Sequence, residues 1–228
     1  MVKLTYHGHS CFLIESGGHK LLIDPFITGN RLAKVKPEGL GCDYILLSHG
    51  HNDHFGDTLQ IAKANNATVI APFELAVFCE QRGCKVHPMQ IGGSHDFDFG
   101  RLKLTIAHHS SAYEMGDSIH YTGNPCGFVL TLDKKKIYHS GDTGLFMDMQ
   151  LIGKKDKLDL ALIPIGGNFT MDIDDAVEAV RFLKPKMAVP MHYDTFDLIK
   201  QDPLQFAKKL KSTKTKAKIV KPGESFTI

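Results

Sequence analysis

The feature that most constrains this chain is a cluster of four potential metal ligands within six residues. His49, His51, Asp53 and His54 form an H-x-H-x-D-H segment. It directly follows residues 44–48, a largely apolar run of the kind that forms a buried strand. The ligands therefore lie where a strand ends, which is where open α/β sheets place their sites. Because imidazole and carboxylate groups suit Zn²⁺, Mn²⁺ or Fe²⁺, the segment predicts a metal site.

The spacing of these four residues predicts more than one ion. Strand-like alternation puts His49 and His51 on one side, whereas Asp53 and His54 begin the next turn and can face a second ion. Two metal ions about 3.5–4 Å apart activate a water and neutralise developing charge during hydrolysis. Such a site needs roughly seven protein ligands, so about three more are expected elsewhere in the chain.

Three other predicted strands also end in residues that can bind metals. Because strand ends converge on one edge of a sheet, we expect these residues to lie beside the H-x-H-x-D-H segment. The strands and the residues that follow them are 102–106 with His108 and His109, 136–139 with Asp142, and 187–190 with His192.

The remaining patterns predict an α/β (α+β) fold in which two sheets carry helices on their outer faces. The helix at 172–183 is clearest, because its apolar residues recur at i, i+3, i+4 and i+7. Asp57 is expected to cap a helix, 92–100 to be turn-rich, and 113–125 to form a polar flap. No linker divides the chain, so 1–228 is expected to be a single domain. Further strands are expected at 2–6, 11–15, 20–24, 68–71, 127–132, 158–163 and near 219 and 226, and further helices at 57–65, 72–82 and 203–211.

Composition narrows the possible partners and the compartment. A net charge of +2 is too small to indicate nucleic acid, and the basic stretch 208–218 is interpreted as a solvated surface. No apolar run indicates a signal peptide or a membrane span. The five scattered cysteines lack any C-x-x-C spacing and fit reduced thiols of a cytoplasmic protein. A homo-oligomer is compatible with all of this.

Seven short segments, spread over nearly the whole chain, carry a resemblance to a known family. They are GHSCF at 8–12, DPF at 24–26, HGHNDH at 49–54, HSS at 109–111, SGDT at 140–143, GGNFTM at 166–171 and PMHYDTF at 190–196. In content and order they resemble the metallo-β-lactamase superfamily, and within it small metal-dependent hydrolases related to the L-ascorbate-6-phosphate lactonase branch. The resemblance implies a four-layer αβ/βα sandwich of two mixed β-sheets with helices outside.

The resemblance also implies a binuclear centre. Two divalent ions are expected, zinc foremost, with manganese, iron or nickel as alternatives. The family's motif has its histidine directly before the pair of small Ser-type residues, which favours His109 over its neighbour His108. The implied ligands are His49, His51 and His109 for one ion, Asp53, His54 and His192 for the other, and Asp142 as the bridge.

Four further residues are weaker candidates for the site. Asp24 matches an aspartate that orients a ligand histidine in the superfamily, although a turn aspartate at a strand end is the alternative. His9 either lines the pocket or is a polar residue satisfied in a turn. Asn168 is a possible pocket residue. Tyr193 either reaches a substrate oxygen or is a half-buried aromatic residue.

The predicted chemistry is hydrolysis by a hydroxide that bridges the two ions, with Asp53 and Asp142 as the catalytic carboxylates. The net positive charge of such a site favours an anionic small-molecule substrate, such as a lactone or ester that carries a phosphate. One alternative is a phosphodiesterase or ribonuclease-like enzyme. An alternative of another class is a protein that holds metal and ligand without turnover.

Overall fold

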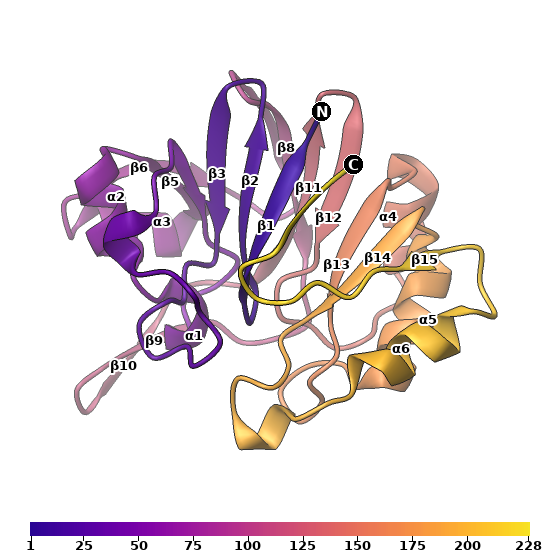
Figure 1. The fold of residues 1–228 in the computed structure, drawn as a ribbon. Coiled ribbons are helices and arrows are strands. Elements are labelled where there is room, and N and C mark those ends of the chain that lie inside the picture. Colours follow the sequence, from indigo (N-terminus) through magenta and orange to yellow (C-terminus); the bar gives the residue numbers. More distant parts are fainter.

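Two seven-stranded sheets pack face to face in the computed structural model, which describes residues 1–228 (Figure 1). Their strand orders are β16-β1-β2-β3-β4-β5-β6 and β15-β14-β13-β12-β11-β8-β7. The first sheet contains β1 (Lys3–Gly8), β2 (Cys11–Ser16), β3 (His19–Ile23), β4 (Tyr44–Leu46), β5 (Thr68–Pro72), β6 (Lys85–Met89) and β16 (Ser225–Thr227). The second contains β7 (Ser94–Phe97), β8 (Gly100–Ile106), β11 (Cys126–Leu132), β12 (Lys135–His139), β13 (Leu160–Pro164), β14 (Met187–Met191) and β15 (Lys216–Ala217).

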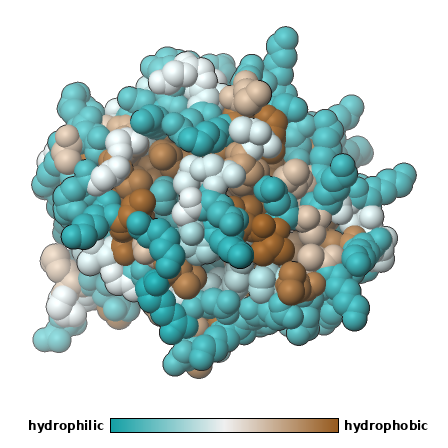
Figure 2. Space-filling view, viewed as in Figure 1, coloured by the Kyte–Doolittle hydropathy of each residue, from teal (hydrophilic) through white to brown (hydrophobic).

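Helices cover the outer face of each sheet, as Figure 1 shows, and the predicted four-layer sandwich is confirmed. The first sheet carries α2 (Thr58–Asn65) and α3 (Phe73–Glu80), and the second carries α4 (Met149–Asp156), α5 (Ile173–Leu183) and α6 (Pro203–Leu210). Viewed from the same side, the outer surface is largely hydrophilic, with apolar groups in a few patches (Figure 2). None of the helices is long and apolar enough to cross a membrane.

Period-two alternation along the strands explains the layers. In β4, Leu46 joins the core between the two sheets, whereas its neighbour Ile45 faces the helices α2 and α3. In β3, Leu22 faces those helices, whereas Leu21 and Ile23 face the other sheet. Because both faces of these strands are buried, the sequence shows continuous apolar runs rather than an apolar/polar alternation.

Parallel pairing brings several strand ends to one edge of the sandwich. Strands β3, β4, β5 and β6 run parallel, as do β12, β13, β14 and β15. The carboxyl ends of β3, β4, β13 and β14 lie toward the lower edge in Figure 1, where the one-turn helix α1 (Asn52–Phe55) follows β4. This edge carries the histidines and aspartates singled out in the sequence.

Several local expectations need correction. Strands β6 and β7 and the helix α4 were not predicted, and β7 occupies much of the segment expected to be turn-rich. The strand expected near 219 is instead the short β15. The segment expected to be a polar flap contains a hairpin of β9 (Ala112–Met115) and β10 (Ser118–Tyr121), and its action as a flap stays a prediction. Asp57 precedes α2 but does not cap it, because its carboxylate accepts hydrogen bonds from the backbone N–H groups of Ile27 and Thr28.

Candidate metal centre

The H-x-H-x-D-H segment is divided by the start of α1. His49 and His51 precede the helix, His51 with extended backbone at the N-cap, and Asp53 and His54 lie within its single turn. Between the first two histidines, Gly50 donates its backbone N–H to Ser111 Oγ at 3.0 Å. A Cβ atom at Gly50 would collide with the side chain of Thr122, so only glycine lets this loop pack so closely. The local fold therefore turns the pair His49 and His51 and the pair Asp53 and His54 toward the same edge.

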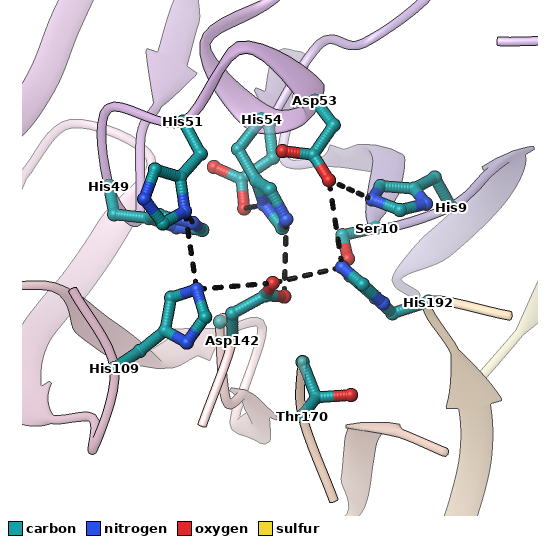
Figure 3. A network of polar contacts seen from close by, with 12 residues as sticks. His9, Ser10, His49, His51, Asp53, His54, His109, Asp142, Thr170 and His192 are labelled. Carbon is teal, nitrogen blue, oxygen red and sulfur yellow. Dashed lines mark hydrogen bonds and ion pairs between the residues drawn. The ribbon is translucent and has the colours of Figure 1, made fainter. Parts of the chain in front are cut away.

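The structure brings seven of the predicted residues together with His9. Imidazoles and carboxylates from both sheets point at a common centre, with Asp142 between the two sides (Figure 3). Each residue offers one ligand atom, and within a group these atoms lie within 4.8 Å of one another. The three overlapping groups are His49, His51 and His109; His49, His54 and Asp142; and His9, Asp53, His54 and His192.

In the first group, a ring nitrogen of His51 lies within hydrogen-bond distance of a ring nitrogen of each of the other two histidines. The Nδ1 atom of His51 lies 3.1 Å from His49 Nε2 and 3.2 Å from His109 Nε2. One proton on Nδ1 can satisfy only one of these two neighbours. A cation at the point where the three nitrogens converge would satisfy all three.

Asp142 and the two histidines beside it also have polar atoms that lie close together without hydrogen bonds. The Oδ1 atom of Asp142 lies 3.1 Å from His54 Nε2, and its Oδ2 atom lies 2.9 Å from His192 Nε2. Nevertheless Asp142 Oδ1, His54 Nε2 and His192 Nε2 are buried without a hydrogen-bond partner. Buried polar atoms are normally paired, and an ion shared by these atoms would complete them. The donor set, imidazole nitrogen with carboxylate oxygen, therefore fits a divalent transition metal.

The protonation states also fit a metal-binding centre. Burial alone would raise the pKa of the Asp142 carboxyl, but the imidazoles of His192 and His54 hold it well below its usual range. Burial alone would lower the pKa of His54, but the carboxylates of Asp142 and Asp24 hold it well above its usual value. Burial lowers the pKa of His49 well below its ordinary value. Asp142 is thus an ionised carboxylate, His49 a neutral imidazole and His54 an imidazolium whose charge a metal ion can replace.

Asp24 and Ser48 fix the orientation of two of these histidines. The fully buried carboxylate of Asp24 accepts hydrogen bonds from Ser48 N at 2.8 Å, Ser48 Oγ at 2.6 Å and His54 Nδ1 at 2.8 Å. Ser48 Oγ also lies 2.9 Å from His49 Nδ1. These contacts leave the Nε2 atoms of both imidazoles free to face the centre. Sequence reasoning missed Ser48, although its place directly before His49 was a usable signal.

His9 is fully buried behind Asp53 instead of lining the cavity. Its Nδ1 atom lies 2.9 Å from Thr195 Oγ1, and its Nε2 atom lies 3.1 Å from Asp53 Oδ2. Burial and the neighbouring His192 lower the pKa of His9 to about 4. His9 is therefore neutral at physiological pH and, if it donates from Nε2, fixes one oxygen of Asp53. Sequence reasoning gave no role to Thr195.

Three of the residues that build the centre have strained backbones. His9, Asp24 and His192 have φ values of 58°, 43° and 56°, a region that residues other than glycine rarely adopt. The His192 N–H donates to the carbonyl of His9 at 2.8 Å, which ties the end of β14 to the loop after β1. Helix ends elsewhere in the chain, such as Lys157 and Lys184, adopt the same region, but at the centre three such residues occur together.

Other weaker candidates lie away from the centre. Asn168 is exposed, and its neighbour Phe169 is the residue that lines the cavity in front of Asp142. Tyr193 is buried in the core beneath α5 and α6, and its exposed edge faces a separate hollow. His108 is exposed and stacks on Phe146, with ring centroids 4.9 Å apart, so that only His109 of this pair joins the cluster.

Two further histidines are buried but belong to none of the three ligand groups. His139, which sequence reasoning placed only at a strand end, is buried at 3.0 Å from the Ser10 carbonyl, and its Nδ1 accepts a hydrogen bond from Gly141 N. It thereby joins the loop that carries Asp142 to the loop after β1. His7 is also buried, and neither of its ring nitrogens is hydrogen-bonded.

A cavity of about 550 Å³ opens onto the centre. Its floor includes Asp53 and Asp142, and its walls come from the β9–β10 hairpin and from the loops that follow β13 and β14. This volume suits a small molecule. The lining residues are His51, Asn52, Asp53, His109, Ser110, Ala112, Glu114, Asp142, Phe169, Phe196 and Leu198.

Comparisons with known proteins agree with this architecture. Residues 3–192 match the model of the beta-lactamase superfamily domain. A UPF0173 metal-dependent hydrolase of Bacillus cereus strain B4264 is 53% identical over 229 residues, covering 100% of both chains. The solved structure of Igni18, a metallo hydrolase from the archaeon Ignicoccus hospitalis, is 39% identical with a TM-score of 0.90 and covers 100% of this chain and 99% of the other.

A solved structure with much lower sequence identity has the same fold. An isothiocyanate hydrolase from Delia radicum gut bacteria superposes with a TM-score of 0.79 over 99% of this chain and 98% of its own, at 20% identity. That likeness concerns the fold alone. The match to the family model and the 53% identity to a full-length relative are much stronger. The chain is therefore a metal-dependent hydrolase that belongs to the metallo-β-lactamase superfamily.

Proposed function

We propose that this protein hydrolyses a small ester, lactone or phosphorylated compound at a binuclear centre. The observation that carries the proposal is the position of Asp142 on the floor of the cavity, within reach of histidines from both sides of the centre. The ligands would be His49, His51 and His109 for one ion and Asp53, His54 and His192 for the other, with Asp142 shared. Zinc is the first choice of metal, and manganese, iron or nickel would suit the same donors.

The chain's own residues prepare this centre for catalysis. Two bound divalent ions would supply an activated water and positive charge toward the transition state. Asp24 and Ser48 hold His54 and His49 in the tautomers that face the centre, and His9 fixes one oxygen of Asp53. Because these partners are buried and already hydrogen-bonded, the ligands need little rearrangement when the ions and the substrate bind.

The proposal also covers the domain organisation and the cellular compartment of the protein. We propose that residues 1–228 act as one domain, because the ligand groups combine residues of both halves and the core between the sheets is shared. The five cysteines are buried and unpaired, which suits the reducing cytoplasm. Hydrolysis of phosphodiesters is the second candidate activity, for which bis(p-nitrophenyl) phosphate is the test substrate.

Metal loading and turnover test the proposal together. Purified protein reconstituted with Zn²⁺ or Mn²⁺ should contain two ions per chain by elemental analysis, and it should hydrolyse at least one of p-nitrophenyl acetate, p-nitrophenyl hexanoate and bis(p-nitrophenyl) phosphate. Asp142→Asn should lose at least one ion and about a hundredfold in turnover, which corresponds to about 3 kcal/mol of transition-state stabilisation.

Asp96→Asn is the matched control, because Asp96 is exposed on β7, pairs with Arg101 and is absent from the lining of the cavity. It should keep the metal and the activity of the wild type. A wild-type protein without bound metal after reconstitution would refute the proposal, and so would an Asp142→Asn variant with two ions and full turnover.

A further inference from the structure

The cavity in front of Asp142 has an apolar wall that faces solvent. Phe169 is 51% exposed and Leu198 is 69% exposed, although both are large apolar side chains. Phe196 belongs to the same lining, and so does Ala112 on the hairpin. Single exposed apolar residues are common, but several in one cavity mark a place where a ligand covers them.

The same lining contains no lysine or arginine. Its only charged residue outside the metal centre is Glu114, which is exposed on β9. Two cations pair with Asp197, the residue before Leu198, at 3.5 Å for Arg31 and 3.0 Å for Lys200. Proteins usually bind a phosphate or carboxylate group with arginine, lysine or free backbone N–H groups. An anionic group outside the centre would instead meet the carboxylate of Glu114.

A second hollow of about 400 Å³ adjoins the first and shares Asn52, Asp53 and Phe196 with it. It extends toward Thr28 and Tyr113, so space is present on both sides of Asp53. A molecule with a scissile bond at the centre can therefore place one part in each hollow. The apolar residues Phe169 and Leu198 line only the larger one.

We infer that the substrate is an uncharged carboxylic ester, lactones included, whose acyl chain is apolar and lies against Phe169, Phe196 and Leu198. The inference rests on the proposed hydrolytic function and selects among its substrate classes. Water adds to the carbonyl carbon, and the bond from that carbon to the alcohol oxygen breaks. The electron pair stays on the alcohol oxygen, which takes up a proton, so that the products are an alcohol and a carboxylic acid that ionises. The step needs no oxidant or reductant.

A substrate series with one leaving group tests the apolar wall. The metal-loaded protein should hydrolyse p-nitrophenyl hexanoate with a kcat/KM on the order of tenfold above that for p-nitrophenyl acetate, because four more methylene groups can leave water. It should hydrolyse bis(p-nitrophenyl) phosphate less efficiently than either ester. Leu198→Ser should reduce the preference for hexanoate at least threefold. Leu204→Ser is the matched control, because Leu204 is 67% exposed on α6 and lies outside the cavity.

Binding without turnover supplies an independent readout. The ketone 2-heptanone carries the pentyl chain of the hexanoyl group beside a carbonyl that cannot be hydrolysed. Saturation-transfer NMR should detect its binding to the wild type and to Leu204→Ser, and a clearly weaker signal with Leu198→Ser. Equal signals from all three proteins would overturn the assignment of the acyl chain to this wall.

Charge reversal tests the exclusion of anions. Glu114→Lys should raise kcat/KM for bis(p-nitrophenyl) phosphate at least threefold relative to p-nitrophenyl hexanoate. Glu80→Lys changes the net charge equally, but Glu80 is exposed on α3 and outside the cavity, so this variant should keep the wild-type ratio. A wild type that prefers the phosphodiester, with Leu198→Ser unchanged, would overturn the substrate class while leaving the hydrolytic function intact. A metal-loaded wild type that cleaves none of the three compounds would instead count against the proposed function.

Discussion

Replacing Asp24 with asparagine tests how a buried carboxylate controls the centre without being one of the proposed ligands. Asp24 Oδ1 accepts a hydrogen bond from Ser48 N, and Oδ2 accepts from Ser48 Oγ and His54 Nδ1. Asparagine has nearly the same shape but only one acceptor oxygen. It also tolerates the left-handed backbone at this position, where φ is 43°, so Asp24→Asn adds no backbone strain.

In either orientation, the NH₂ group of the new amide faces another N–H donor. If its oxygen keeps Ser48 N, its NH₂ group faces the N–H of His54 Nδ1, and the imidazole relieves that contact only by losing the Nδ1 proton and keeping one on Nε2, the atom that faces the centre. If the amide is turned, its NH₂ group faces Ser48 N. Hydrogen bonds to charged groups contribute about 1.5–3 kcal/mol each, and at least one is lost. The loss corresponds to roughly ten- to a hundredfold in equilibrium, the range found when a partner of a ligand histidine is removed.

We therefore expect Asp24→Asn to bind Zn²⁺ about ten- to a hundredfold more weakly than the wild type, measured by competition with a chelating dye. Asp43→Asn is the matched control, because the Asp43 carboxylate also accepts a backbone hydrogen bond, from Lys20 N at 2.8 Å, but is exposed near the opposite end of β4. Zinc affinity of Asp24→Asn within twofold of the wild type would refute the reasoning. An equal loss in Asp43→Asn would show that the effect is not specific to the centre.

Three further predictions concern metal ligation and stability. His109→Ala should lower metal occupancy, measured by elemental analysis, whereas His108→Ala should leave it unchanged because His108 stacks on the surface; the reverse pattern would exchange their roles. Asp172→Ala should cost about 1 kcal/mol in urea unfolding, because Asp172 caps α5 through the N–H groups of the residues at 174 and 175, and no loss would contradict that. Gly153→Ala should cost about 1–3 kcal/mol in the same assay, because its Cβ would collide with the Leu183 carbonyl where α4 crosses α5; a stability equal to the wild type would show that the helices move apart freely.

The sequence alone was enough to predict the layers of the fold. Apolar runs such as 158–163 and the stripe of α5 are local signals, because burial of a strand or a helix face requires them wherever the element packs. The strands that were missed, β6 and β7, have mostly exposed or half-buried residues and so lack that signal. The helix α4 was missed for a related reason: of its eight residues only Met149 and Ile152 are buried.

The candidate ligands could also be predicted, because each follows directly on a recognisable strand. Four of them lie within six residues, so their proximity depends on no distant contact. Asp142 and His192 are reached by parallel strands whose ends meet at one edge. Whether metal binds at all of them stays a prediction until the ions are measured.

Tertiary structure alone decided what surrounds those ligands. The buried pairing of His9 with Asp53 and Thr195 joins residues 44 and 186 positions apart, and no local pattern encodes such a contact. The choice of Phe169 over Asn168 for the cavity depends on how the loop after β13 turns, with Asn168 at a φ of 50°. The sequence therefore determined the donor atoms and the sheet edge that carries them. The packing of distant loops determined their hydrogen-bond partners and the apolar, cation-free wall that a substrate meets.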